Sequence, residues 1–244
     1  MRQARLRTDD GIVRGRYTDG RIVAADGEYE VGRDGSLTYP CAPSAIYCVG
    51  RNYAETLEQM DYDRPPEPDF FIKPPASLSG HGDPIRYPGW TDELTYAGEL
   101  AAVVDRRCRD VPEANVSEVI RGYTVMNDVD ALDQQGRTAR KAFDGSGPLG
   151  PWIETDLNPE GIGMETVING ETRQDANTEL MLFSPAEIVS FLSRRFTLRP
   201  GDVIAFGSPA NPGTVESGDV IEITYEGVGT LRNHVVGPSD GDAA

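Results

Sequence analysis

Residues 94–104 read LTYAGELAAVV, an apolar run that contains a single acid, Glu99. The run is readable as a β-strand, and its other inward-looking positions carry only aliphatic and small side chains. A lone carboxylate in such a strand has two interpretations. Either Glu99 is a metal ligand, or it is the remnant of a site that has been lost.

Similar strand-like runs continue on both sides of this stretch, from Ile46 onward. Helical patterns are fewer, with a short candidate at residues 52–60 and a stronger one at residues 184–195. Ser184 is placed to cap the second helix, because a proline follows it and Glu187 lies three residues on. We therefore predict a mostly β, α+β fold. The strand-like runs are IYCVG, FFIKP, GELAAVV, GYTVMNDV, METVING, GDVIAFG and VIEITYEG.

The first 35 residues are organised differently from the rest of the chain. Four Asp-Gly pairs separate short strand-like runs, and Asp-Gly tolerates the positive φ angles of tight hairpin turns. This pattern predicts a small antiparallel β meander over residues 1–43, followed by a main domain over 44–238 and a polar tail over 239–244. The pairs begin at Asp10, Asp19, Asp26 and Asp34.

Acidic residues outnumber basic ones by 40 to 23, which gives a formal net charge of −17. Only two of the bases are lysines, Lys73 and Lys141. A surface this acidic and nearly free of lysine resembles the proteins of salt-loving microbes, in which concentrated salt screens self-repulsion. No basic face remains to neutralise phosphates, which argues against a nucleic-acid partner.

Neither a membrane segment nor a secretory signal is readable in the sequence. No apolar window reaches about 18 residues, and the N-terminus has no signal-peptide core. The cysteines lack metal-type spacing and cannot all pair, so we interpret them as ordinary buried thiols of a reducing compartment. We expect a cytoplasmic protein without a membrane partner. The cysteines are Cys41, Cys48 and Cys108.

Two features of the main domain carry possible chemistry. Asp128 follows an apolar strand and is trailed by Asp130 and Asp133, and carboxylates that converge from separate strands suit a hard cation such as Mg²⁺. A solvated turn at a strand end is the alternative interpretation. Lys141 is the second feature, since a lysine in a chain that otherwise excludes them favours a specific role. The Gly- and Pro-rich run after it matches no phosphate-loop motif.

Taken in order, these segments resemble the fumarylacetoacetate hydrolase family over about residues 45–236. The resemblance implies a mixed β-roll-like fold preceded by a small N-terminal β domain, and a homodimer. It also implies Mg²⁺- or Mn²⁺-dependent chemistry on small 2-oxo or 1,3-dioxo acids; members include C–C hydrolases, decarboxylases and enol–keto isomerases. The matching motifs are VGRNY, FIKPP, GDPI, YxGELAAVV, GYTVMND, KAFDGSGPLGPW, NGETRQ, NT, PGDVIAFGSP, GDVIEI and GxGxLxN.

The metal site implied by the resemblance is incomplete in this chain. In the family, the strand that holds Glu99 reads Asp-Tyr-Glu-x-Glu-Leu, and its two glutamates bind the metal together with the aspartate of an Asn-Asp motif. Glu99 and Asp128 match two of these ligands, but Ala97 stands at the position of the first glutamate. By resemblance, Glu99 is the survivor of a three-carboxylate site.

Two further departures fall in the same site. The family's hydrolases activate water with a histidine and a glutamate on the helix after the Asn-Tyr pair, and these positions are Thr56 and Gln59 here. Neither side chain is a general base near neutral pH. Leu132 replaces an arginine that supports the site or pairs with a substrate carboxylate. Hydrolysis by the usual pair is therefore not expected.

Two hypotheses follow. In the first, the protein is an enzyme with altered chemistry, in which Glu99 and Asp128 hold Mg²⁺ or Mn²⁺ weakly or not at all, Asp130 is a possible third oxygen donor, and Lys141 is catalytic. Metal-assisted enolisation of a 2-oxo or 1,3-dioxo acid suffers less from the losses than hydrolysis does. In the second, the protein is a catalytically silent homologue that retains the fold, with or without a ligand pocket. The substrate-binding residues implied by the resemblance are Asp144, Thr178 and Ser208.

Overall fold

The computed structural model describes residues 1–61, 63–210 and 213–238. Its largest sheet follows the order β4-β3-β2-β1-β14-β12-β11-β17-β6-β7, with β5 beside β1 and β8 beside β14. The strands of this sheet are β1 (Arg2–Thr8), β2 (Gly11–Thr18), β3 (Arg21–Val23), β4 (Glu28–Glu30), β5 (Ser36–Thr38), β6 (Ile46–Gly50), β7 (Asp69–Lys73), β8 (Leu78–Ser79), β11 (Gly98–Val104), β12 (Ile120–Asn127), β14 (Gly147–Glu154) and β17 (Val203–Ala205).

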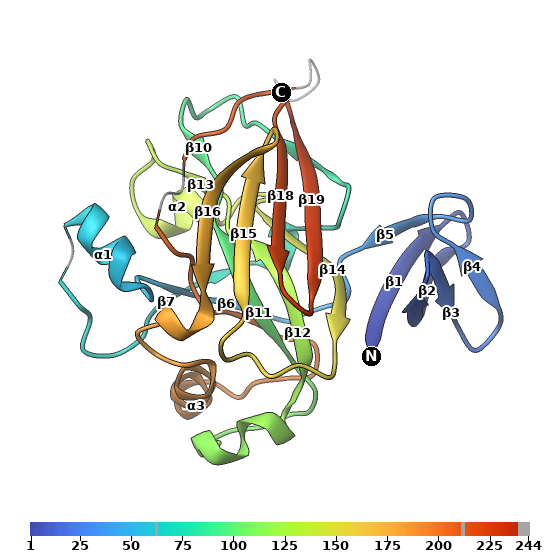
Figure 1. Ribbon diagram of the computed structural model, residues 1–244, viewed down its shortest axis with the longest axis horizontal. Coiled ribbons are helices and arrows are strands. Elements are labelled where there is room, and N and C mark those ends of the chain that lie inside the picture. Colours follow the sequence, from blue (N-terminus) through green and yellow to red (C-terminus); the bar gives the residue numbers. More distant parts are fainter. Residues whose placement is uncertain (62, 211–212, 239–244) are drawn as a thin grey trace.

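A second sheet has the order β16-β15-β18-β19-β9, and it lies in front of β11 and β12 in the view of Figure 1. A two-stranded pair, β10 (Leu94–Thr95) with β13 (Asp130–Ala131), lies beside the start of β11. The strands of the second sheet are β9 (Pro84–Arg86), β15 (Gly163–Ile168), β16 (Glu171–Asn177), β18 (Val220–Tyr225) and β19 (Gly229–Val236). The α-helices are α1 (Ala54–Met60), α2 (Arg137–Lys141) and α3 (Pro185–Arg195), and the 3₁₀ helices are η1 (Pro75–Ser77), η2 (Glu113–Glu118) and η3 (Thr178–Leu180).

Strand β11 is buried on both faces, which explains its nearly uniform apolar sequence. Leu100, Ala102 and Val104 pack into the main core, together with residues of the second sheet and of α3. Ala101 and Val103 face the opposite side and join a second cluster. Because side chains alternate along a strand, Glu99 shares the face of Ala101 and Val103. The strand therefore carries a carboxylate into the interior.

The strongest predicted helix is confirmed. Ser184 caps α3, since its side-chain oxygen accepts a hydrogen bond from the backbone N of Glu187, and the Glu187 carboxylate accepts one from the backbone N of Ser184. The apolar face of α3, which includes Ile188 and Leu192, is buried in the main core. The short helix predicted at residues 52–60 forms as α1. The mostly β fold predicted from the sequence is confirmed as well.

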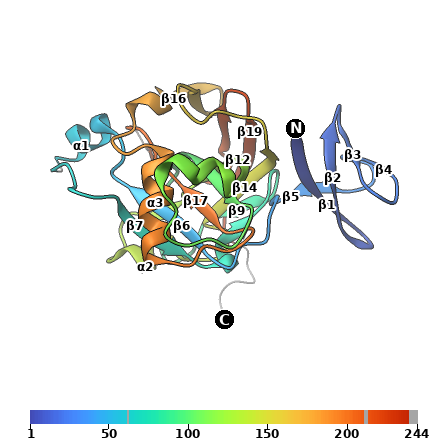
Figure 2. The ribbon, with the colours of Figure 1, turned by 90° about the horizontal axis from the view of Figure 1, so that it is seen from below.

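Strands β1–β5 project to one side of the molecule, opposite α1 (Figures 1 and 2). Each Asp-Gly pair lies at the junction of two consecutive strands, with Gly11 already the first residue of β2, and at Asp19–Gly20 both residues have positive φ angles, 47° and 80°. The first residues of β1 pair with β14, from Arg2 opposite Glu154. The N-terminal strands are thus hydrogen-bonded into the largest sheet. The division of the chain into domains at residue 43 stays a prediction, and the predicted tail at 239–244 lies outside the described residues.

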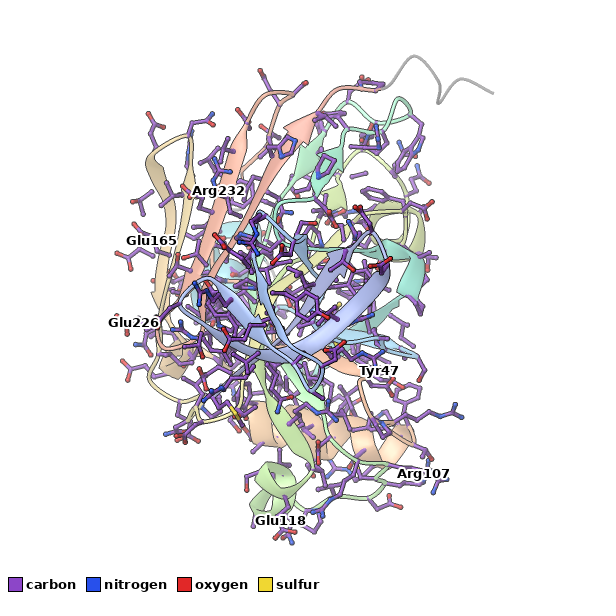
Figure 3. All side chains as sticks on the ribbon, turned by 90° about the vertical axis from the view of Figure 1, so that its right-hand side faces the viewer. Tyr47, Arg107, Glu118, Glu165, Glu226 and Arg232 are labelled. Atoms are coloured by element: carbon purple, nitrogen blue, oxygen red, sulfur yellow. The ribbon has the colours of Figure 1, made fainter. Side chains whose placement is uncertain are left out.

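Acidic side chains stand far out on the surface, as Glu118, Glu165 and Glu226 do in Figure 3. Within the described ranges, no helix combines the length and the apolar character needed to cross a membrane. Because acidic residues outnumber basic ones by 40 to 23, the charge of the surface is mostly negative.

We expect the melting temperature to rise with KCl from dilute buffer to 1 M. Mutual repulsion among the charges that make up the net −17 opposes the compact state, and at 1 M salt the screening length falls to about 3 Å. Thermal melts across a KCl series, followed by circular dichroism, measure this effect. A flat or falling melting temperature contradicts the prediction.

Candidate functional site

The site forms where β11 and β12 run antiparallel. Gly98 pairs with Asn127, so Ala97 and Asp128 are the next opposed positions, and the backbone N of Asp128 donates to the Ala97 carbonyl at 2.9 Å. The Asn127 side chain in turn accepts from the backbone N of Ala97 at 3.0 Å. Because side chains alternate along strands, Ala97 and Glu99 share one face. The position of the family's first glutamate therefore lies directly beside Asp128.

Asp128 is buried between two lysines. Lys141 Nζ lies 2.5 Å from its Oδ2, and Lys73 Nζ lies 2.9 Å from its Oδ1. Lys73 is completely buried, and its ammonium also donates to the carbonyls of Val129 at 3.1 Å, Lys141 at 2.5 Å and Ser146 at 2.8 Å. The ammonium of Lys73 thus pairs with Oδ1 of Asp128, while the three carbonyls and the Ser146 hydroxyl compete for its hydrogens. Burial opposes ionisation, yet Lys141 and Lys73 outweigh it and lower the pKa of Asp128.

Helix α2 supplies Lys141 and the neighbouring Arg140. Arg140 binds Asp130 through two hydrogen bonds, from Nε at 2.8 Å and from Nη2 at 2.6 Å, and Lys141 Nζ lies 3.1 Å from the same carboxylate. Burial alone lowers the pKa of Lys141, but the charges of Asp128 and Asp130 raise it above its usual value. Lys141 is therefore a fixed ammonium ion. Asp130 thus binds two of the three cations of α2, Arg140 and Lys141, and its role as an oxygen donor to a metal stays a prediction.

Glu99 lies at the bottom of the site, and its Oε2 accepts a hydrogen bond from the backbone N of Gly207 at 3.0 Å. Burial, together with the nearby charge of Asp128, raises the pKa of Glu99 to about 8. Two buried tyrosines stand near it. Tyr225 donates to the Gly98 carbonyl at 3.3 Å, whereas the hydroxyl of Tyr53 finds no hydrogen-bond partner among the described residues. Burial is thus the largest cause of the raised pKa of Glu99, and charged and hydroxyl groups lie around it.

The donor set for a divalent cation is small. Over residues 1–61, 63–210 and 213–238, no cluster of three or more His, Cys, Asp or Glu residues could hold a metal ion. Glu99 and Asp128 remain, and the buried Oδ1 of Asp128 has no well-aligned hydrogen-bond donor among the described residues, although Lys73 Nζ lies 2.9 Å away. Mg²⁺ is commonly held by one or two carboxylates, with water and substrate as the other ligands. The residues present therefore fit a weakly held Mg²⁺ or Mn²⁺, with two positive neighbours opposing it.

Ser208 lies in the loop that follows β17 and is held by two side chains. Gln174 donates from Nε2 to Ser208 Oγ at 2.9 Å and to the Pro209 carbonyl at 3.0 Å, and its Oε1 accepts from the backbone N of Gly98 at 3.2 Å. Thr56, on α1, donates to the Ser208 carbonyl at 3.1 Å. Gln174 thus links the loop of Ser208 to the strand of Glu99. Thr56 makes a structural hydrogen bond at the position where the family's hydrolases carry their histidine.

The remaining predicted site residues make contacts of other kinds. Thr178 Oγ1 donates to the Pro159 carbonyl at 2.8 Å and accepts from the backbone N of Ile162 at 3.0 Å, so its hydroxyl is occupied by the backbone. Asp144 is exposed, and the structure records no polar contact for it among the described residues. Gln59 is exposed on α1. Roles for Thr178 and Asp144 in substrate binding stay predictions.

Sequence reasoning missed Lys73 as a site residue. The only available signal was the scarcity of lysine, which pointed equally to Lys73 and Lys141. It also missed Gln174 and Arg140: Gln174 ends the NGETRQ motif, but neither that motif nor the sequence around Arg140 reveals the partners that lie 76 and 10 residues away.

Comparison with known proteins gives three consistent findings. The model described as "Fumarylacetoacetate (FAA) hydrolase C-terminal" matches residues 45–236. The crystal structure of 5-carboxymethyl-2-hydroxymuconate delta-isomerase from Mycobacterium smegmatis superposes with a TM-score of 0.90 at 36% identity, covering 98% of this chain and 100% of that one. Oxaloacetate tautomerase YisK from Bacillus subtilis is 35% identical over 207 residues, which are 78% of this chain and 69% of that protein.

A further solved structure bears on the metal. Fumarylpyruvate hydrolase from Pseudomonas aeruginosa, in complex with Mn²⁺ and pyruvate, superposes with a TM-score of 0.77 at 32% identity, covering 85% of this chain and 94% of that one. The fold expected from the sequence motifs is therefore confirmed.

Proposed function

Because this chain belongs to the fumarylacetoacetate hydrolase family, we propose that it enolises a small 2-oxo or 1,3-dioxo acid at the site formed by Glu99, Asp128 and Lys141. The observation that carries the proposal is the ammonium of Lys141, which is fixed between the carboxylates of Asp128 and Asp130 at 2.5 and 3.1 Å. Two similar proteins are an isomerase and a tautomerase by name, and both reactions interconvert enol and keto forms.

Enolisation moves a proton from the carbon beside an oxo group to the oxo oxygen, on which negative charge develops. A positioned ammonium stabilises this charge, and its effect is largest where water is excluded and the donor does not have to reorganise. Asp128 and Asp130 restrain the ammonium of Lys141, and Arg140 in turn holds Asp130. Lys73 compensates the charge of Asp128 from the opposite side, so that Lys141 is not the only cation that keeps this carboxylate ionised.

The substitutions at the water-activating positions favour isomerase, tautomerase or decarboxylase chemistry over hydrolysis. Thr56 uses its hydroxyl to bind the Ser208 carbonyl, and an alcohol is no base near neutral pH. Enol–keto interconversion consumes no water, so it does not need this pair. Ser208, whose hydroxyl is held by Gln174, is the proposed contact for a substrate carboxylate.

Glu99 and Asp128 are the proposed metal ligands. A bound Mg²⁺ or Mn²⁺ supplies Lewis-acid polarisation of the oxo group. We expect weak binding, with a dissociation constant of tens of micromolar or above. Loss of a single outer-shell partner already lowers metal affinity by roughly 10–100-fold, and here one of the direct ligands is absent. Calorimetric titration with each ion measures the constant. Sub-micromolar binding contradicts the prediction.

The function is tested by ultraviolet assay of oxaloacetate tautomerisation and by pyruvate release as a measure of decarboxylation, each with Mg²⁺ or Mn²⁺. We expect Lys141→Met to lower kcat by about 100-fold or more. Arg137→Gln is the matched control: it removes a cation from the same helix, but one that binds Asp69 at 2.7 Å, and we expect activity within about 3-fold of the natural protein. A folded natural protein without activity on a panel of 2-oxo and 1,3-dioxo acids supports the silent homologue instead.

A further inference from the structure

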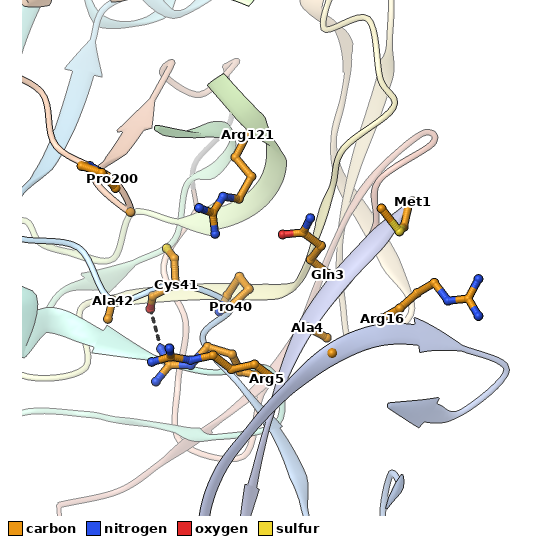
Figure 4. Close-up of a pocket in the computed structure, with 13 residues that line it drawn as sticks. Met1, Gln3, Ala4, Arg5, Arg16, Pro40, Cys41, Ala42, Arg121 and Pro200 are labelled. Atoms are coloured by element: carbon orange, nitrogen blue, oxygen red, sulfur yellow. Dashed lines mark hydrogen bonds between the residues drawn. The ribbon is translucent and has the colours of Figure 1, made fainter. Parts of the chain in front are cut away.

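A cleft of about 580 Å³ lies between the N-terminal strands and the main body (Figure 4). Arg5, Arg14 and Arg16 reach it from β1 and β2, and Arg121 reaches it from β12. The backbone of Cys41 passes between Arg5 and Arg121. A cleft lined by four arginines is unexpected in a protein whose net charge is −17.

Arg5 is held in place within this cleft. It is 9% exposed, its Nη1 donates to the Cys41 carbonyl at 2.8 Å, and its guanidinium carbon lies 5.2 Å from the centre of the Tyr39 ring. Its Nε is buried and has no hydrogen-bond partner among the described residues. An arginine that is nine-tenths buried without a carboxylate partner is costly, because burial penalises its charge. Arg5 is therefore a fixed positive charge in the wall of the cleft, held by the Cys41 carbonyl and the Tyr39 ring.

The positive charges in the cleft are poorly compensated. Burial, and then the charge of Arg14, lowers the pKa of Arg5. Among the described residues, no carboxylate lies within 4.0 Å of a guanidinium nitrogen of Arg5, Arg14 or Arg16, although acids outnumber bases by 40 to 23. Arg121 pairs with Asp105 at 3.1 Å, at a carboxylate that is half exposed. Three of the four arginines in the cleft therefore have no carboxylate within ion-pair distance, and the fourth has one that is half exposed.

We propose that this arginine cleft binds a small polyanion that carries two or more phosphate or carboxylate groups. Guanidinium groups form paired hydrogen bonds with both anions, and groups on opposite walls of the cleft suit a ligand with two separated charges. The volume lies within the range of small-molecule sites. An extended polyanion such as nucleic acid does not fit, because the surrounding acidic surface repels it. This inference is independent of the proposed enolisation.

Calorimetric titration with pyrophosphate and with citrate tests the proposal, at one KCl concentration in which the protein is folded. We expect a single site for at least one of the probes. Arg14→Gln with Arg121→Gln should weaken it by at least 10-fold, since both side chains are on the surface and their replacement leaves the buried Arg5 in place. Arg86→Gln with Arg107→Gln removes the same charge elsewhere and should stay within 2-fold. Tighter binding of pyrophosphate identifies a phosphate ligand, and tighter binding of citrate identifies a carboxylate ligand.

Three results overturn the proposal. The first is that neither probe binds to the folded natural protein. The second is that the cleft variant binds as tightly as the natural protein while Lys141→Met does not, which places the anion at the enolisation site. The third is that light scattering shows a change of oligomeric state in the cleft variant. Such a change means that an acidic segment of a second copy of the protein, and not a small polyanion, occupies the cleft.

Discussion

Lys73→Met is expected to lower the free energy of unfolding by about 3–5 kcal/mol, since removal of one partner of a buried ion pair leaves the other charge uncompensated. The loss extends beyond the pair. The ammonium also satisfies the carbonyls of Val129, Lys141 and Ser146, which the methionine leaves without this donor. Urea unfolding at constant KCl measures the change.

Two variants serve as controls for this effect. Lys141→Met should cost clearly less, because the Lys141 side chain is 15% exposed and Asp128 retains Lys73. Lys73→Met combined with Asp128→Asn should recover part of the stability, since the uncompensated carboxylate is then absent. If Lys73→Met lowers the free energy of unfolding by less than about 1 kcal/mol, the Lys73–Asp128 pair does not stabilise the fold as predicted.

Ala97→Glu is expected to tighten Mg²⁺ or Mn²⁺ binding by at least 10-fold. The new carboxylate is placed on the same face as Glu99 and beside Asp128, whose backbone N binds the Ala97 carbonyl. Three carboxylates on one face form a more complete oxygen site than two. Calorimetric titration of the variant and of the natural protein, in the same KCl buffer, measures the gain.

The matched control for this variant is Ala97→Gln, which adds a side chain of the same size without the charge. It should bind the metal no more than about 3-fold more tightly than the natural protein does. Unchanged metal affinity in a folded Ala97→Glu protein contradicts the placement of the site. A strongly destabilised variant shows instead that the pocket has closed around the alanine and that the added charge is buried.

Rebuilding the water-activating pair extends the test from binding to catalysis. We expect Thr56→His and Gln59→Glu, added to Ala97→Glu, to produce hydrolysis of an acylpyruvate that the natural protein does not cleave. Thr56 faces the loop of Ser208, so a histidine there starts close to the site. Tighter metal binding without new hydrolysis points to Leu132 as the next position to change.

Local structure was predictable from the sequence because it depends on local chemistry. The Asp-Gly pairs mark the turns between β1 and β5, and the residues around Ser184 form the cap of α3. The proximity of Glu99 and Asp128 followed from the family motifs. The apolar pattern alone shows that β11 is buried, but it does not reveal which strand lies beside it.

Long-range partners were not predictable in the same way. Lys73 ends an edge strand and lies 55 residues before Asp128, and nothing in the pattern of FFIKP indicates that its side chain points inward. The arginine cleft was hidden for a related reason. Its members come from three strands, and a net charge of −17 describes the whole surface without showing where positive charge is concentrated.

The position of β4 at one end of the largest sheet bears on how the protein avoids self-association. An unpaired sheet edge is a template for another chain, and short, charged edge strands limit that risk. Strand β4 has three residues, with Glu28 and Glu30 exposed on either side of Tyr29. Glu28 and Glu30 are paired with Arg21 and Arg33, so at low salt it is the overall net charge of −17 that repels a second copy approaching along this edge. In concentrated salt the repulsion is screened, so the shortness of β4 becomes the feature that prevents edge-to-edge aggregation.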